Sequence, residues 1–225
     1  MIRPDLVIPA YVCLGLLGLG MLIFIGWGLA TRRHAIPCPS WLAWVLESPF
    51  GEDRRVASTL TRLDLRPGMR VLDAGCGPGR LTIPIARQVV PQGRVTALDI
   101  QQGMLRRAQD RAQIAHVSNV DFVQAELGAG TLERGSYDRA LLVTVLGEIP
   151  DREAALQEIF DALKPGGMLS VTEIMLDPHY QSRRTILRLA TPIGFRERGF
   201  FGSPLTFTLN LGKPASEAEL GRKAA

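Results

Sequence analysis

The stretch from Arg70 to Arg80, RVLDAGCGPGR, constrains the fold of this chain more than any other part of it. An apolar run leads to an acidic residue, Asp73, and three glycines then follow at every second position. After them, residues 81–86 return to an apolar pattern typical of a helix. Glycine permits a sharp turn and lets a ligand approach bare main chain, while the start of a helix offers unpaired N–H groups. The stretch therefore predicts a strand, a ligand-binding loop and a helix.

The loop lacks the marks of two common nucleotide sites. The dinucleotide fingerprint of dehydrogenases has glycine or alanine where this chain has Arg80, and a P-loop would end in Gly-Lys-Ser/Thr. The pattern instead resembles the first motif of class I methyltransferases that depend on S-adenosylmethionine. In that family the loop backbone contacts the methionine part of the cofactor, and the preceding acid lies near its ammonium. The resemblance gives these roles to Asp73, Gly75, Gly77 and Gly79.

Further strand-like segments follow, and their ends carry the other residues that the resemblance places at the cofactor. Asp99 lies near the end of the second segment, residues 95–100, and matches a carboxylate that binds a ribose diol. Glu126 ends the third segment and matches the acid near the adenine amino group, although this family more often has Asp there. Ile100 and Thr144, at the ends of the second and fourth segments, complete the expected cofactor site.

The order of these segments predicts the fold. A fourth strand, Tyr137–Thr144, and a Lys-Pro-Gly-Gly turn at 164–167, before a fifth strand, continue the series. Residues 195–201 and 205–211 alternate like an antiparallel pair. The resemblance covers about residues 52–213 and implies an α/β fold: a Rossmann-like, seven-stranded, mostly parallel sheet with helices on both faces.

A transmembrane helix is expected before this domain. Residues 6–30 contain no charged side chain, and the core of this run, residues 10–30, would reach about 31 Å as a helix, enough to cross a bilayer. A signal peptide is a less favoured alternative because its apolar region is usually shorter. A buried core helix would show a polar face, which is absent here. Arg32 and Arg33 follow the run, so the positive-inside rule places the rest of the chain in the cytoplasm, as a single-pass membrane protein.

The sequence thus divides into four parts: an anchor at 1–34, a linker helix at 35–52, a methyltransferase domain at 53–213 and a polar tail at 214–225. The linker carries Trp41 and Trp44. Indole rings prefer the headgroup level of a bilayer, so the linker is expected either to lie on the membrane or to pack its tryptophans on the domain.

The composition limits the kinds of partner that the chain is expected to bind. The net charge of +4 fits a membrane surface weakly, and no basic strand interleaved with aromatic residues points to nucleic acid. Three scattered cysteines, Cys13, Cys38 and Cys76, predict neither a disulfide framework nor a zinc site, so no metal is expected. The sequence does not indicate an oligomeric state.

The expected activity is transfer of a methyl group from S-adenosylmethionine to a lipophilic acceptor. Such transfer needs mainly in-line placement of the reacting atoms. Glu148, His179 and Tyr180, together with Asp177, are the candidates for binding the acceptor or taking its proton. An anchored domain reaches headgroups easily, which favours a phospholipid amine such as phosphatidylethanolamine over a quinone precursor. Arsenite is disfavoured because cysteines are missing from acceptor positions, and a non-catalytic membrane scaffold that binds S-adenosylmethionine is the alternative from another class.

Overall fold

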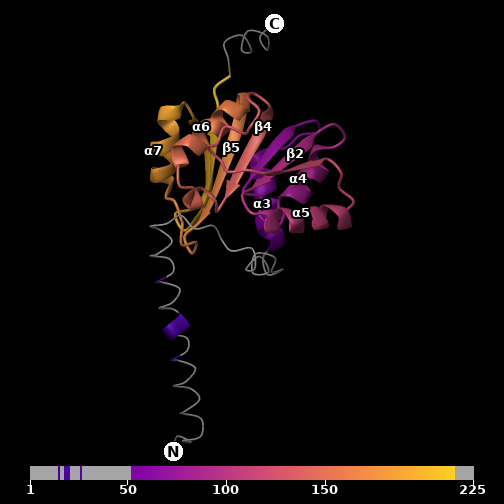
Figure 1. Cartoon of the computed structure of the whole chain (residues 1–225). Coiled ribbons are helices and arrows are strands. Elements are labelled where there is room, and N and C mark those ends of the chain that lie inside the picture. The colour runs from indigo at the N-terminus through magenta and orange to yellow at the C-terminus, as the bar shows by residue number, and fades with distance from the viewer. Residues whose placement is uncertain (1–14, 16–17, 21–25, 27–51, 216–225) are drawn as a thin grey trace, which may run out of the picture.

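The structure, a computed structural model, describes residues 52–215 and, before them, residues 15, 18–20 and 26. The described part contains a seven-stranded sheet in the order β3-β2-β1-β4-β5-β7-β6 (Figure 1). Strands β1 to β5 run parallel to one another, whereas β7 is antiparallel to both β5 and β6. The predicted mostly parallel, seven-stranded sheet is therefore confirmed. The strands are β1 (Arg70–Ala74), β2 (Arg94–Asp99), β3 (Val120–Gln124), β4 (Tyr137–Val143), β5 (Leu163–Ile174), β6 (Arg196–Ser203) and β7 (Thr206–Gly212).

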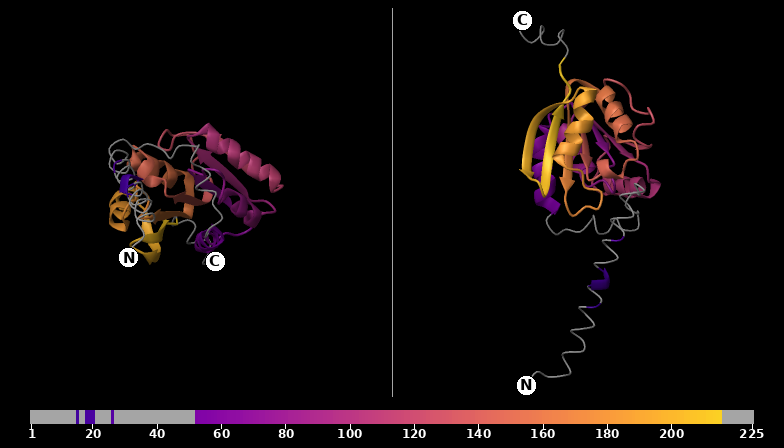
Figure 2. Two further views of the ribbon diagram at one scale, coloured as in Figure 1. Left: turned by 90° about the horizontal axis from the view of Figure 1, so that it is seen from below. Right: turned by 90° about the vertical axis from the view of Figure 1, so that its left-hand side faces the viewer.

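Helices cover both faces of this sheet (Figures 1 and 2). Successive side chains of a strand point to opposite faces. In β1, Val71 packs with Ile85 on one face, and Leu72 packs with Leu156 on the other. The sheet is thus buried on both sides, as parallel sheets require. The helices are α3 (Glu52–Leu63), α4 (Thr82–Val89), α5 (Gln102–Ile114), α6 (Arg152–Ala162) and α7 (Arg183–Ile193), with a short 3₁₀ turn, η2 (Leu146–Glu148).

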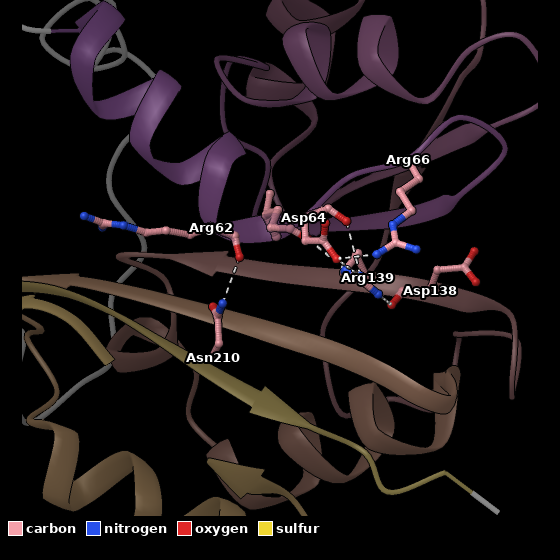
Figure 3. A network of polar contacts seen from close by, with 7 residues as sticks. Arg62, Asp64, Arg66, Asp138, Arg139 and Asn210 are labelled. Carbon is pink, nitrogen blue, oxygen red and sulfur yellow. Dashed lines mark hydrogen bonds and ion pairs between the residues drawn. The ribbon is translucent and has the colours of Figure 1, made fainter. Parts of the chain in front are cut away.

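Helix α3 is fastened to the middle of the sheet by polar contacts at its last turn (Figure 3). The Nδ2 of Asn210 on β7 donates to the carbonyl of Arg62 over 2.8 Å, and Nε of Arg139 on β4 donates to the carbonyl of Leu63 over 2.7 Å. The last carbonyls of a helix have no partners within the helix, so these side chains satisfy groups that would otherwise need water. The helix is therefore an integral part of the domain.

The Lys-Pro-Gly-Gly segment differs from the prediction. It does not precede the fifth strand but lies inside the range of β5, where the pairing with β4 shifts register. Pro165 has no N–H to donate to a ladder, and Gly166 has a φ of +76°, which favours glycine. Gly166 instead donates its N–H to the carbonyl of Lys213 over 3.1 Å. The segment thus forms an irregularity in the strand rather than a turn before it.

The predicted membrane and linker helices lie almost entirely outside the described residues, as does the tail beyond Ala215. Residues 15, 18–20 and 26, within the apolar run, are helical. Among the described residues, no helix has the length and apolar character that crossing a membrane requires. The anchor, the linker and the four-part division therefore stay predictions.

Candidate active site

A cavity of about 290 Å³ opens at the carboxyl ends of the central strands. The chain order of the strands reverses between β1 and β4, which is where open α/β sheets bind ligands. The walls of the cavity come from the glycine loop, the ends of β2, β3 and β4 and the loop after β5. Eight of the predicted site residues line this cavity: Gly75, Gly77, Asp99, Ile100, Glu126, Thr144, Glu148 and Asp177.

The three glycines of the loop all have positive φ, but their surroundings differ. A Cβ on Gly75 would lie 2.5 Å from Cγ2 of Val145, and a Cβ on Gly79 would lie 3.0 Å from Cβ of Ala108 on α5. At Gly75 and Gly79, neighbouring atoms therefore leave no room for a side chain. A Cβ on Gly77 would meet nothing within 4 Å. Gly77 therefore presents bare main chain to the cavity, whereas Gly79 lets the loop pack closely against α5.

Asp99, at the end of β2, holds the loop in place. One carboxylate oxygen accepts the N–H of Gly77 over 2.9 Å, and the other accepts the N–H of Gln101 over 2.8 Å. Burial raises the pKa of Asp99, and these two N–H groups oppose that rise. Since Asp99 also lines the cavity, its carboxylate both shapes the glycine loop and faces the ligand space.

Asp73 does not line the cavity described here. It is 4% exposed, and its Oδ2 accepts the hydroxyl of Thr82, the first residue of α4, over 2.6 Å. Burial raises the pKa of Asp73 to about 6, opposed by the Thr82 hydrogen bond. Alternation along β1 puts Asp73 on the same face as Val71, beneath α4, and this explains the difference from the predicted place near the cofactor. The hydrogen bond between Asp73 and Thr82 thus links β1 to α4, the helix that follows the glycine loop.

Thr144, just after β4, is a strained position in the cavity wall. Its φ is +55°, which is unusual for a β-branched residue. Its backbone N–H donates to the carbonyl of Thr172 over 2.9 Å, and its hydroxyl donates to the carbonyl of Val143 over 2.7 Å. Backbone strain of this kind gathers at functional sites. The conformation turns the chain from β4 into the η2 segment that carries Glu148.

The lining of this cavity combines apolar side chains with four carboxylates. Apolar side chains supply one kind of lining: Leu98, Ile100, Met104, Leu127, Val143, Val145, Ile149 and Pro150. Carboxylates supply the other: Asp99, Glu126, Glu148 and Asp177. Burial raises the pKa of Asp177, and the backbone N–H of His179, 2.7 Å from its Oδ1, opposes the rise. The cavity suits a ligand with a cationic part and an apolar part.

His179 and Tyr180 line a neighbouring cavity of about 390 Å³, together with Arg152 and the start of α7. Gly147 lies against the backbone of His179, where any side chain would collide with the carbonyl, and it also belongs to this second cavity. The hydroxyl of Tyr180 donates to the carbonyl of Pro204 over 2.6 Å. The structure thus separates these two candidates from Glu148, and a catalytic role for either stays a prediction.

Glu173, near the end of β5, is an acidic residue that the sequence does not single out. It is 1% exposed, its Oε2 accepts the N–H of Gln181 over 3.2 Å, and its Oε1 has no hydrogen-bond partner among the described residues. Burial raises its pKa to about 8, and the carboxylates of Asp177 and Glu148 add to the rise while Arg152 opposes it. The carboxyl group is therefore mainly protonated at neutral pH, and it lies near Asp177 and Glu148 of the first cavity.

Replacing Glu173 by glutamine should flatten the pH dependence of stability. In the unfolded chain this carboxyl ionises near 4.5, whereas in the fold it keeps its proton until about 8. The folded state therefore binds more protons across this window, and stability falls as pH rises. Between pH 6 and pH 8, we expect the unfolding free energy of the wild type to fall by about 2 kcal/mol more than that of Glu173→Gln. Denaturant titrations at the two pH values measure this, and equal losses in both proteins would contradict it.

Comparison with known proteins assigns the family. The profile described as a methyltransferase domain matches residues 65–192, more than half of the chain. The chain belongs to the methyltransferase-domain family. The demethylmenaquinone methyltransferase of Lactococcus lactis is 34% identical over 117 residues, 52% of this chain and 46% of that protein. The ubiquinone/menaquinone biosynthesis C-methyltransferase UbiE of Pasteurella multocida is 36% identical over 118 residues, 51% of this chain and 44% of that protein. The chain therefore spans a little under half the length of these relatives.

Solved structures agree on the fold. A SAM-dependent methyltransferase from Aquifex aeolicus superposes with a TM-score of 0.73 at 19% identity, over 79% of this chain and all of that one. The phosphoethanolamine N-methyltransferase 2 of Haemonchus contortus superposes with a TM-score of 0.60 at 16% identity, over 72% of this chain and 53% of that one. These structures confirm the fold alone. The family match confirms the predicted methyltransferase family and, with it, S-adenosylmethionine as the expected cofactor.

The residues present fit this cofactor. Gly77 leaves open space for close contact with main chain, and Asp99 offers a carboxylate at the end of β2 where a ribose diol would bind. Ile100 and Leu127 line the cavity together with Glu126, and their apolar side chains suit an adenine ring. Gly75, Thr144 and Val145 border the remaining part of the cavity, toward Glu148. The assignment of each contact stays a proposal.

Proposed function

We propose that this chain transfers a methyl group from S-adenosylmethionine to a lipophilic acceptor at the carboxyl end of its sheet. One observation carries the proposal: the glycine loop, Asp99, several apolar side chains and the carboxylates of Glu148 and Asp177 all line one cavity. When bound, the cofactor would supply a sulfonium methyl group, whose carbon a nucleophile attacks while the neutral thioether leaves. The chain's part is to hold the acceptor in line with that methyl group, and positioning alone can supply much of such a rate.

The acidic end of the cavity is suited to accept a proton from the acceptor. A phenolic hydroxyl or an ammonium group must lose a proton before or during methylation. Burial raises the pKa of Asp177, which makes its carboxylate a stronger base near neutral pH. The backbone N–H of His179 fixes the orientation of that carboxylate. Asp177 and Glu148 are therefore our candidates for the proton acceptor, and Glu173 lies close enough to both for their charges to raise its pKa.

The relatives favour a quinone-type acceptor over the phospholipid amine that the sequence favours. The relatives from Lactococcus lactis and Pasteurella multocida carry names from quinone biosynthesis at 34% and 36% identity, whereas the likeness to the phosphoethanolamine enzyme, at 16% identity, concerns the fold alone. A flat ring also suits the wall formed by Val145, Ile149 and Pro150. We therefore put a quinone precursor first. The amine remains a second candidate because Glu148 and Asp177 would attract a cation.

We further propose that the chain is held at a cytoplasmic membrane surface through residues 1–34. The support is the uncharged run of residues 6–30 followed by Arg32 and Arg33. A membrane location suits a lipophilic acceptor. It also leaves the cofactor site, which lies wholly within residues 75–177, outside the apolar run.

The acceptor can be tested with defined substrates. Purified full chain in vesicles receives S-adenosylmethionine and either reduced demethylmenaquinone or phosphatidylethanolamine, and mass spectrometry detects added methyl groups. We expect the wild type to methylate the quinol. The Asp99→Ala variant should do so at least about 100-fold more slowly. Methylation of phosphatidylethanolamine alone would select the second candidate. A wild-type protein that binds the cofactor but modifies neither acceptor would contradict both.

A further inference from the structure

The second cavity, which lies beside the cofactor cavity, differs from it in charge. Its volume of about 390 Å³ is within the range of about 300–1,000 Å³ that is usual for small-molecule sites. Among the described residues that line it, Arg152 is the only arginine or lysine, and none is a carboxylate. Four carboxylates line the cofactor cavity. The first cavity therefore attracts cations, whereas the second attracts anions.

The two cavities share two short segments of the chain. In η2, Gly147 lines the second cavity and Glu148 lines the first. In the loop after β5, Asp177 lines the first cavity and Pro178 lines the second. A ligand in the second cavity would therefore lie next to the segments that carry the candidate proton acceptors.

Arg152, the first residue of α6, has hydrogen-bond donors to spare. Its Nη2 donates to the carbonyl of Gly147 over 3.2 Å, and its buried Nε has no hydrogen-bond partner among the described residues. A guanidinium has five N–H donors, and their planar arrangement matches the oxygens of a carboxylate or a phosphate. A buried donor without a partner is unfavourable. An oxyanion in the cavity would satisfy such a donor.

The charge of Arg152 is poorly balanced within the cavity. It acts on the carboxyl of Glu173, whose rise in pKa it opposes, but that carboxyl is mainly protonated at neutral pH. Asp151 and Glu153 flank Arg152 in the sequence, yet both are exposed and neither lines the cavity. The guanidinium therefore leaves positive charge beside the empty space of the cavity.

The amino end of α7 borders the same cavity through Ser182 and Thr185. Helix α7 packs against α6, which Arg152 begins (Figure 1). Ser182 caps α7 by accepting the N–H of Thr185 over 3.1 Å, so the N–H groups of Arg183 and Arg184 have no partners within the helix. The amino end of a helix favours negative charge, but the first turn of α7 carries no acidic residue. A bound anion would supply the charge that the sequence of α7 does not.

We propose that the second cavity binds an oxyanion, a phosphate or carboxylate group, between the guanidinium of Arg152 and the amino end of α7. The guanidinium and the helix terminus come from different elements and favour the same kind of ligand. A cationic ligand fits less well because it would meet the charge of Arg152 with no carboxylate in the described lining to offset it. The site goes beyond the methyl transfer proposed above, since it binds an oxyanion whichever acceptor is methylated.

Titration with inorganic phosphate tests this site in the wild type. The detergent-solubilised full chain is labelled with ¹⁵N and titrated at pH 7 and constant ionic strength, and NMR follows its backbone amide signals. We expect the amides of Arg183, Arg184 and Thr185 to shift along one saturating curve, with a dissociation constant on the order of 1 mM. The amides of Gly77 and Gln101, which line the cofactor cavity, should stay in place. No saturating shift at 183–185, or equal shifts at all five amides, would overturn the proposal.

Two matched variants test the role of the guanidinium. Arg152→Gln removes the charge but keeps an amide donor for the carbonyl of Gly147, and it should weaken phosphate binding about tenfold or more. Arg184→Gln is the control because Arg184 lies in the first turn of α7, is exposed and does not line the cavity. At physiological ionic strength this control should change the affinity by less than about twofold. Equal weakening by both changes would indicate general attraction to basic residues and would overturn the site.

Phenyl phosphate distinguishes two sources of the oxyanion. If the group belongs to a larger molecule such as the acceptor, the ring adds apolar contacts. Phenyl phosphate should then bind about tenfold or more tightly than inorganic phosphate and should also shift the amide of Glu148. Equal affinities without that shift would indicate a free oxyanion, and either result supports the site. None of these measurements depends on methyl transfer, so a chain that binds phosphate but methylates nothing would contradict only the proposed function.

Discussion

Replacing Asp99 by alanine is expected to weaken binding of S-adenosylmethionine by about 100-fold or more, the largest loss among single changes in the cavity. The carboxylate accepts the N–H of Gly77 and the N–H of Gln101, and it faces the ligand space. Asp99 is also expected to accept two ribose hydroxyls of the cofactor. Hydrogen bonds to a charged group contribute about 1.5–3 kcal/mol each, so loss of these two weakens binding by about 3 kcal/mol or more. Calorimetric titration of the detergent-solubilised full chain measures this loss.

Asp121→Ala is the matched control for this change. Asp121 lies on the neighbouring strand β3, its side chain is 50% exposed, and it pairs with Arg94 over 2.6 Å rather than facing the cavity. The sequence places Asp121 at a strand start in solvent, and the structure adds the Arg94 partner. The Asp121→Ala change removes one carboxylate, as Asp99→Ala does, but it leaves the hydrogen bonds of the glycine loop intact. Equal affinities of Asp99→Ala and Asp121→Ala for the cofactor would contradict the role given to Asp99.

Replacing Gly75 by alanine is expected to lower both stability and cofactor affinity. The new Cβ would lie 2.5 and 2.7 Å from the two methyl carbons of Val145, at a residue whose φ is +73°. Overpacking of this kind costs about 1–3 kcal/mol beyond the backbone strain. Because Val145 lines the cavity, relieving the clash must move either the loop or the wall. Thermal unfolding and calorimetry measure the two effects.

Two variants separate the clash from the strain. Gly68→Ala puts alanine at a φ of +85° where a Cβ meets nothing within 4 Å, so it carries the strain alone. Gly75→Ala should be less stable than Gly68→Ala by about 1–3 kcal/mol. Adding Val145→Ala to Gly75→Ala should recover most of that difference. Equal stabilities of Gly68→Ala and Gly75→Ala would show that Gly75 is needed for its backbone conformation and not for close packing.

Local patterns were enough to predict most of the fold. The glycine loop, the strand ends at Asp99 and Thr144 and the alternating pair before Gly212 are all set by neighbours in the sequence. Most of the predicted site residues at strand ends line one cavity, because the carboxyl ends of parallel strands meet at one edge. The Lys-Pro-Gly-Gly segment was misplaced because its conformation depends on pairing with the end of β7.

The remaining differences come from contacts between distant segments. Asp73 points beneath α4 because of the alternation of β1, which a motif alone does not reveal. His179 and Tyr180 follow Asp177 within three residues, yet the turn held by Ile174 leaves only Asp177 lining the first cavity. Glu173 was missed because it stands within an apolar strand, and its burial becomes visible only with the sheet assembled.

Transfer of a labelled methyl group tests the central claim most directly. The full chain in vesicles made from a bacterial lipid extract is incubated with S-adenosylmethionine labelled in its methyl group, and the lipid-soluble products are extracted and identified by mass spectrometry. We expect label in a lipophilic product with the wild type and with Asp121→Ala, and almost none with Asp99→Ala. A wild-type protein that binds the cofactor while all label stays in water-soluble compounds would contradict methyl transfer to a lipophilic acceptor.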